Sequence, residues 1–239
     1  MSQESLCARY TRVLESIDVA CARFGRDATS VQLLAVSKFH TVEAIFALQA
    51  LGQRVFGENY VQEALAKMQT FAAKGLDPKA SFHLIGHVQS RKASSVAGRF
   101  ALIHTLDSKK LATALEKQLA LQNMLQDVLI EVNIAKEPQK NGVKIEDLRP
   151  LVAHLKEQCP HIKLQGLMCM PPFAAQGELA RPYFASLRGL KEELEAEWGS
   201  LPHLSMGMSS DFPWAIAEGA TIVRIGTAIF GPRPKQERL

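Results

Sequence analysis

A lysine at the end of an apolar run is the residue of this sequence best suited to covalent chemistry. Lys38 follows residues 31–36, Val-Gln-Leu-Leu-Ala-Val, which predict a buried strand. A helical pattern follows over residues 41–51, so Lys38 lies where a strand of an α/β fold opens into its loop, where such folds keep their reactive groups. Partial burial at such a position frees an amine to form a Schiff base with a carbonyl compound. A strand-end lysine that merely reaches solvent is commoner, so the neighbouring residues must decide.

A second group of polar residues follows the last two predicted strands, residues 203–208 and 221–226. Ser209 comes at the start of a helical stretch, and Gly226 and Thr227 supply an unobstructed backbone and a hydroxyl. In TIM barrels the loops after strands seven and eight often hold a phosphate with backbone N–H groups. Taken singly, the serine is better explained as a helix cap and the glycine as a turn residue.

Arg224 lies two residues before Gly226 on the same strand face, so its side chain is expected to point into the barrel mouth. An interior arginine paired with a carboxylate such as Glu131 is the alternative interpretation. An amine and a phosphate site on opposite sides of one mouth suit a phosphorylated aldehyde, and pyridoxal 5′-phosphate (PLP) is the obvious one. Further residues follow the other predicted strands at the same edge: Glu58, Asn59, Gln89, Asp107, Asn133, Met168, Met170 and Met208.

Short apolar runs alternate with helical patterns along the chain. Parallel strands need an intervening crossover, so the alternation predicts an α/β fold with a parallel sheet, and eight such units match a single-domain TIM (β/α)8 barrel. A doubly wound sheet is the alternative, but residues 37–40 lack the glycine-rich turn that usually follows its first strand. The predicted strands are residues 31–37, 54–57, 82–86, 102–106, 127–133, 162–170, 203–208 and 221–226. The predicted helices are residues 41–51, 60–73, 89–97, 108–123, 145–158, 178–198 and 210–218.

An extra helix is predicted before the barrel, over about residues 2–24. Apolar residues recur there at spacings of three and four, and Gly25 ends the pattern. No low-complexity tract or Pro/Gly linker divides the chain, so one domain is expected over residues 1–239, with the barrel at about 31–231.

The composition is that of an ordinary globular protein, with 47% hydrophobic and 22% charged residues. The net charge is only +4 and no cluster of basic residues occurs along the sequence, so the sequence does not support nucleic-acid binding. The N-terminus lacks a basic segment followed by an apolar core, so we expect no signal peptide, and no apolar run reaches membrane-spanning length. We therefore expect a soluble cytoplasmic protein without a metal or a membrane partner. Its cysteines lack disulfide or metal-site spacing: Cys7, Cys21, Cys159 and Cys169.

Five segments are long enough to compare with known families. They are residues 35–38 (Ala-Val-Ser-Lys), 56–63 (Phe-Gly-Glu-Asn-Tyr-Val-Gln-Glu), 83–89 (His-Leu-Ile-Gly-His-Val-Gln), 204–209 (Leu-Ser-Met-Gly-Met-Ser) and 223–231 (Val-Arg-Ile-Gly-Thr-Ala-Ile-Phe-Gly). All five resemble the YggS/PROSC family of PLP homeostasis proteins, in order and over nearly the whole chain. The resemblance implies a fold-type III PLP-binding barrel, like the N-terminal domain of alanine racemase.

The resemblance also implies roles for individual residues. Lys38 matches the lysine that carries PLP as an internal aldimine, and Arg224 matches the arginine that faces the pyridine nitrogen. Gly226 and Thr227 match phosphate contacts. Lys140 lies in residues 139–142, which resemble a Lys-x-Gly loop near the family's pocket; without the resemblance it is a solvated loop lysine. The expected cofactor-binding residues are therefore Lys38, Asn59, Lys140, Met208, Ser209, Arg224, Gly226 and Thr227.

Binding of PLP is better supported by the sequence than catalysis with PLP. A two-base racemase takes one base from a C-terminal β-domain, which we do not expect here because Leu239 ends the chain eight residues after Gly231. An arginine keeps its proton, so it leaves the pyridine nitrogen unprotonated and the ring a weaker electron sink. We predict a non-enzymatic, monomeric protein of intracellular PLP homeostasis that buffers PLP or supplies it to apo PLP-dependent enzymes. The alternatives are a weak amino-acid racemase, another fold-type III PLP enzyme, or an aldolase-like barrel, whose Schiff-base lysine normally lies on a later strand.

Overall fold

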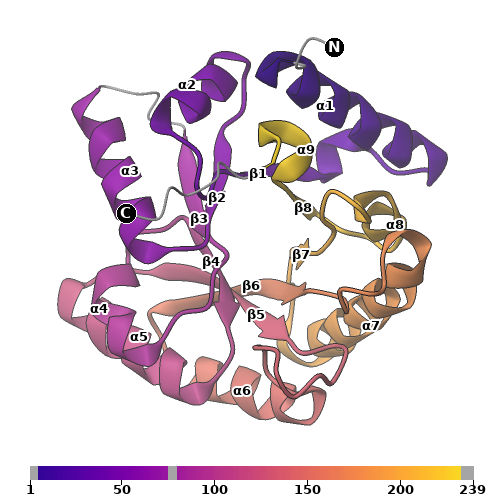
Figure 1. Ribbon diagram of the computed structural model, residues 1–239. Helices are drawn as coiled ribbons and strands as arrows, with labels where there is room; N and C mark the ends of the chain where they lie inside the picture. Colours follow the sequence, from indigo (N-terminus) through magenta and orange to yellow (C-terminus); the bar gives the residue numbers. More distant parts are fainter. Residues whose placement is uncertain (1–4, 75–79, 233–239) are drawn as a thin grey trace.

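The computed structural model describes residues 5–74 and 80–232, which form a closed barrel of parallel strands surrounded by helices (Figure 1). Each strand pairs with the next along the chain, and the last pairs with the first. This arrangement confirms the predicted single-domain TIM barrel. The strands are β1 (Gln32–Val36), β2 (Val55–Glu58), β3 (Ser81–Leu84), β4 (Leu102–Leu106), β5 (Gln126–Val132), β6 (Ile162–Cys169), β7 (His203–Ser205) and β8 (Ile222–Ile225).

The helices follow the predicted order, although several are shorter than predicted. The helix predicted over residues 89–97 is a 3-10 turn followed by the one-turn α4, and α9 was not predicted, because a single turn is too short to show a helical period. The described part of the extra N-terminal helix begins at Leu6, and residues 2–4 lie outside the described residues. The α-helices are α1 (Leu6–Arg23), α2 (Val42–Ala50), α3 (Val61–Ala73), α4 (Ala93–Val96), α5 (Lys109–Gln122), α6 (Ile145–Gln158), α7 (Arg181–Trp198), α8 (Phe212–Ala217) and α9 (Thr227–Phe230).

The extra helix α1 lies in the outer ring beside α8 and α9, as Figure 1 shows. Arg9 of α1 donates from Nε to the Ile229 carbonyl at 2.7 Å, and Arg26 donates to the Ala220 carbonyl at 2.6 Å. These bonds tie α1 and the turn after it to the segments that follow and precede β8. Within the described residues, no helix is long and apolar enough to cross a membrane.

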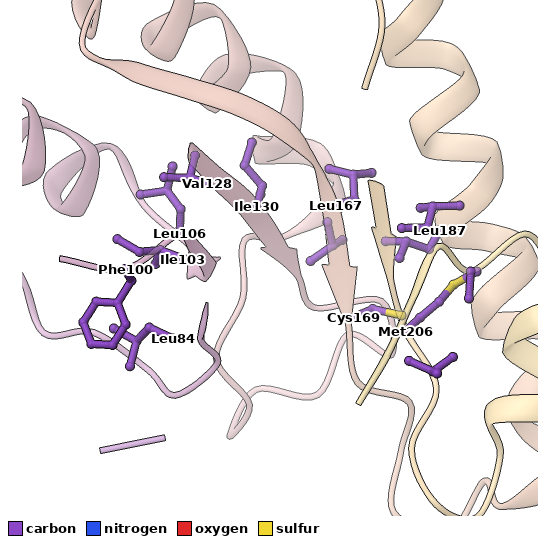
Figure 2. Close-up of a cluster of buried hydrophobic side chains, with 14 of the residues drawn as sticks. Leu84, Phe100, Ile103, Leu106, Val128, Ile130, Leu167, Cys169, Leu187 and Met206 are labelled. Carbon is purple, nitrogen blue, oxygen red and sulfur yellow. The ribbon is translucent and has the colours of Figure 1, made fainter. Parts of the chain in front are cut away.

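The two faces of the barrel wall have different environments. On β5, Val128 and Ile130 face the helices within the apolar layer of Figure 2, whereas Leu129 packs inside the barrel. Leu129 shares the interior with Leu34, Leu102, Met168 and Ile222. Two residues further along the strands, on the same inward face, the interior becomes polar. The buried polar residues at that level include His104, Glu131 and Arg224.

Candidate functional site

A cavity of about 430 Å³ opens at the C-terminal ends of the strands. This volume lies in the usual range of small-molecule sites. Most of the predicted site residues line it: Lys38, Asn59, Met208, Ser209, Arg224, Gly226 and Thr227. The fold therefore brings together residues from the ends of β1, β2, β7 and β8, as expected where the carboxyl ends of parallel strands meet.

Lys140 is the predicted site residue that this cavity does not include. It lines an adjoining cavity of about 380 Å³, which shares Met170, Phe173 and Met208 with the first. Its ammonium donates to the Pro171 carbonyl at 2.9 Å and pairs with Glu137 at 2.5 Å. A cofactor contact by Lys140 stays a prediction.

Sequence reasoning missed His40, Ile85 and Phe173, which also line the cavity. His40 was within reach of the sequence, because it lies two residues after Lys38 in the same loop. Its ring stacks on Phe230, with ring centroids 4.6 Å apart, and burial lowers its pKa. Phe173 lies in an irregular loop after β6 and no local pattern points to it.

Asn59 is placed by a close approach of two loops. A Cβ on Gly86 would lie 1.9 Å from the Asn59 carbonyl oxygen, so only glycine fits at that position. The Gly86 carbonyl in turn accepts a hydrogen bond from the Thr105 hydroxyl at 2.8 Å. The side-chain oxygen of Asn59 is buried and has no hydrogen-bond partner among the described residues. Such an orphaned polar atom beside a cavity is available to a ligand.

Arg224 is a buried cation held by neutral groups. Its guanidinium donates to the Ser205 hydroxyl oxygen at 2.8 Å and to the Cys169 carbonyl at 2.9 Å. The Ser205 hydroxyl lies 2.9 Å from His104 Nδ1, and His104 Nε2 lies 3.0 Å from His83 Nδ1. Burial lowers the pKa of His83 to about 4 and that of His104 well below its ordinary value. Both imidazoles are therefore neutral at pH 7 and add no second charge to that of Arg224.

Glu131 does not form the ion pair that the sequence offered as an alternative for Arg224. The hydrogen bonds of Arg224 go to Ser205 and Cys169, and Oε2 of Glu131 is buried without a hydrogen-bond partner within the described part of the chain. Burial, with a smaller contribution from Asp107, raises the pKa of Glu131 to about 7. A carboxyl group that is only about half ionised at pH 7 does not fully neutralise the arginine.

Hydroxyl groups gather at the ends of β7 and β8. Ser209 Oγ accepts a hydrogen bond from the Ala228 N–H at 3.4 Å, which joins the loop after β7 to α9. Neither Ser209 nor the following Ser210 caps α8, because Asp211 is the N-cap residue. The Asp211 carboxylate accepts a hydrogen bond from the Met208 N–H at 2.6 Å. The helix-cap interpretation of Ser209 is therefore wrong, and its hydroxyl lines the cavity with that of Thr227. Among the described residues, no cluster of three or more His, Cys, Asp or Glu side chains is arranged to hold a metal ion.

Comparison with known proteins agrees with this geometry. Residues 14–234 match the family model described as alanine racemase, N-terminal domain. A "pyridoxal phosphate homeostasis protein" of Aquifex aeolicus is 47% identical over 228 residues, which are 95% of this chain and 98% of the relative. The chain belongs to the family of pyridoxal phosphate homeostasis proteins. The Escherichia coli pyridoxal phosphate homeostasis protein is 40% identical over 93% of this chain and 94% of its own length.

Solved structures of the family share the barrel. PipY of Synechococcus elongatus, in a structure described as having PLP bound, aligns with a TM-score of 0.78 and 37% identity over 90% of this chain and 100% of its own. An alanine racemase of Clostridium difficile aligns with a TM-score of 0.68 over 93% of this chain and 56% of its own. Its 13% identity shows a shared fold alone.

Proposed function

We propose that this protein binds PLP at the barrel mouth through Lys38 and serves PLP homeostasis rather than catalysis. The observation that carries the proposal is the convergence of an amine, a buried arginine and a group of hydroxyls on one cavity of about 430 Å³. Membership of a family whose relatives are named for PLP homeostasis supports it, as does the PLP-bound structure of PipY.

The residues of the cavity fit PLP chemically. When bound, PLP supplies an aldehyde that combines reversibly with a primary amine, and Lys38 is the lysine of the described cavity lining. Arg224 is fixed by two hydrogen bonds, and in this proposal its guanidinium faces the pyridine nitrogen. Asn59 offers its orphaned amide oxygen to a ligand donor. The phosphate contacts in this proposal are Ser209, Gly226 and Thr227, and Met208 lines the same side.

Arg224 favours storage of PLP over its catalytic use. A guanidinium retains its proton near neutral pH, so Arg224 can donate a hydrogen bond to the ring nitrogen without protonating it. The electron sink on which PLP enzymes rely is weaker under these conditions. The curated relatives quoted above are likewise named as homeostasis proteins, not as enzymes.

The proposal includes a route for the cofactor: the loaded protein acts as a cytoplasmic monomer and hands PLP to apo PLP-dependent enzymes. Its described cysteines are free thiols, as expected in a reducing compartment. In the test, an apo PLP enzyme is mixed with the loaded protein, and its regain of activity is compared with the rate at which PLP dissociates into solution. Activity that returns faster than PLP dissociates supports direct supply. Activity that returns only at the dissociation rate reduces the protein to a passive buffer.

A second assay tests PLP binding itself. Titration of the cofactor-free protein with PLP is expected to produce a visible absorbance band in the wild type and to leave Lys38→Ala without it. A wild type that binds no PLP under these conditions would refute the proposed function. Size-exclusion chromatography of the same samples tests the monomeric state.

A further inference from the structure

The turn that carries Lys38 rests on a buried ionic cluster, here called the Lys67 cluster and made of Glu58, Glu63 and Lys67. Lys67 of α3 is 6% exposed, and its ammonium donates to the Glu58 carboxylate and to the Glu63 carboxylate, each at 2.7 Å. Its third bond, of 2.8 Å, goes to the Ser37 carbonyl. An ammonium has three N–H donors, so all of its donors are used.

The Lys67 cluster holds both peptide groups that flank Lys38. The Ser37 carbonyl belongs to the peptide bond before Lys38 and accepts from Lys67. The Phe39 N–H belongs to the peptide bond after it and donates to Glu63 Oε1 at 2.6 Å. Fixing two successive peptide planes fixes the φ and ψ angles between them, and hence the direction in which the Lys38 side chain leaves the backbone.

The backbone next to Lys38 adopts a conformation that needs such support. Phe39 has a φ of 65°, in the left-handed region that bulky side chains rarely occupy. A residue stays in this region when its surroundings over-determine it, and such residues cluster at functional sites. The bond from Phe39 to Glu63 and the packing of its ring on Tyr60, with centroids 5.1 Å apart, supply that restraint.

The cluster acts from outside the cofactor cavity. None of its three residues lines the cavity of about 430 Å³ that Lys38 enters. Glu63 and Lys67 instead line a separate hollow behind the turn, together with Phe39 and His40. A buried ammonium shared by two carboxylates is a costly way to stabilise a fold, since apolar residues of similar size often do as well. The Lys67 cluster binds the two peptide groups that flank Lys38, and this position gives the costly ionic group a role beyond stabilising the fold.

We propose that Lys67, with Glu58 and Glu63, is a positioning device that aims the Lys38 amine into the cavity for attachment of the PLP aldehyde. This inference rests on the proposed function. A cluster that only stabilises the fold would affect every ligand of the cavity equally, whereas a positioning device affects the ligands that bond to Lys38.

Pyridoxine 5′-phosphate separates these cases, because it has an alcohol in place of the aldehyde and cannot attach to an amine. Lys67→Met is expected to weaken PLP binding by about tenfold or more, as misplaced reacting groups do. The same change should leave the affinity for pyridoxine 5′-phosphate within about twofold of wild type. Lys74→Met is the matched control: Lys74, at the end of α3, has a half-exposed side chain, and both affinities should stay unchanged.

A pair of variants at Glu63 keeps the test valid if Lys67→Met does not fold. Glu63→Gln retains an oxygen that can accept from the Phe39 N–H, whereas Glu63→Leu removes it. Hydrogen exchange of the Phe39 amide in the cofactor-free protein should remain slow in Glu63→Gln and become at least about tenfold faster in Glu63→Leu. Only Glu63→Leu should then show the selective loss of PLP affinity.

The outcomes distinguish the inference from the proposed function. A wild type that does not bind PLP defeats the proposed function itself. A wild type that binds PLP, with variants that lose both ligands in parallel or lose neither, overturns the positioning role and leaves the proposed function standing. Equal Phe39 exchange in the two Glu63 variants would also overturn it.

Discussion

At the scale of the residue, Arg224 and Glu131 bring ionisable groups that can carry a charge at neutral pH into the barrel interior, beside the neutral imidazoles of His83 and His104. Arg224 is satisfied by a hydroxyl and a carbonyl, so its charge is not neutralised by its hydrogen-bond partners. An uncompensated buried charge is costly and favours a ligand that accepts a hydrogen bond from it. Glu131, with its raised pKa, adds no full negative charge near neutral pH.

The raised pKa of Glu131 predicts a pH dependence of stability. Its pKa rises from 4.5 to about 7 on folding, so the folded state holds a proton that the unfolded chain releases. The resulting stability is present at low pH and is lost as the pH rises through about 7. The shift contributes about 3 kcal/mol to the free energy of unfolding at low pH.

Glu131→Gln replaces the titrating carboxyl group with an amide that does not ionise, so this variant serves as the reference. Urea unfolding of both proteins between about pH 5 and about pH 8 should show the wild type losing about 2–3 kcal/mol relative to the variant. Parallel pH profiles would show that Glu131 titrates normally in the folded protein.

Thr227 is expected to bind the phosphate. A hydrogen bond to a charged group contributes about 1.5–3 kcal/mol, so Thr227→Val should weaken PLP binding about tenfold or more. Pyridoxal lacks the phosphate, and its binding should change little. Equilibrium titration with both ligands checks the prediction, and an equal loss for both would place Thr227 outside the phosphate site.

The sequence predicted most of the cavity-lining residues because they follow the ends of strands, and parallel strands bring their ends to one edge of the sheet. It did not reveal what holds them. Ser205 and His104 are 101 positions apart, and Lys67 lies 30 positions from Ser37. No local pattern connects residues at such separations; closure of the barrel does.

At the scale of the element, the loops after β2 and β3 depend on each other through Gly86. An alanine at this position would place its Cβ 1.9 Å from the Asn59 carbonyl oxygen, which forces the two loops apart. Gly86→Ala should therefore cost about 1–3 kcal/mol of stability and lower PLP affinity by displacing Asn59.

Gly189→Ala is the matched control for this prediction. Gly189 lies within α7, where an added Cβ meets no atom within 4 Å, so alanine should stabilise the protein by about 0.5–1 kcal/mol. Urea unfolding of both variants, with PLP titration, tests the pair. A Gly86→Ala protein with unchanged stability and affinity would show that the loops adjust freely.

Sequence patterns were enough to predict the strands and the long helices. The strands were predictable from apolar runs, since most of their residues are buried on both faces. The long helices α5 and α7 were predictable from their period. The one-turn α4 and α9 were not delimited, because about one turn contains no repeat to detect.

At the scale of the whole molecule, the barrel holds both ends of the proposed ligand on one rigid frame. Lys38 follows β1 and the proposed phosphate contacts follow β7 and β8, so the directly paired strands β1 and β8 carry the amine and part of the proposed phosphate site. Strand pairing between them sets the distance from the amine to the phosphate residues. Such a frame suits retention of a cofactor without large movement of the chain.

A protein that holds PLP but does not use it should turn over amino acids slowly. The wild-type kcat for racemisation or transamination is expected far below the roughly 1–10³ s⁻¹ that is typical of enzymes. Exchange of the α-proton of common amino acids in D₂O measures this directly. A rate within the enzymatic range with any of them would restore the racemase alternative.

Covalent labelling of the loaded protein tests the central claim most directly. Borohydride reduction should fix a pyridoxyl group on the protein, and mass spectrometry of its peptides should locate that group on Lys38. Lys38→Ala should yield no labelled peptide from the barrel mouth, although Lys140 is still present in the adjoining cavity. A pyridoxyl group found in the intact wild type on another lysine, with Lys38 unmodified, would contradict the account.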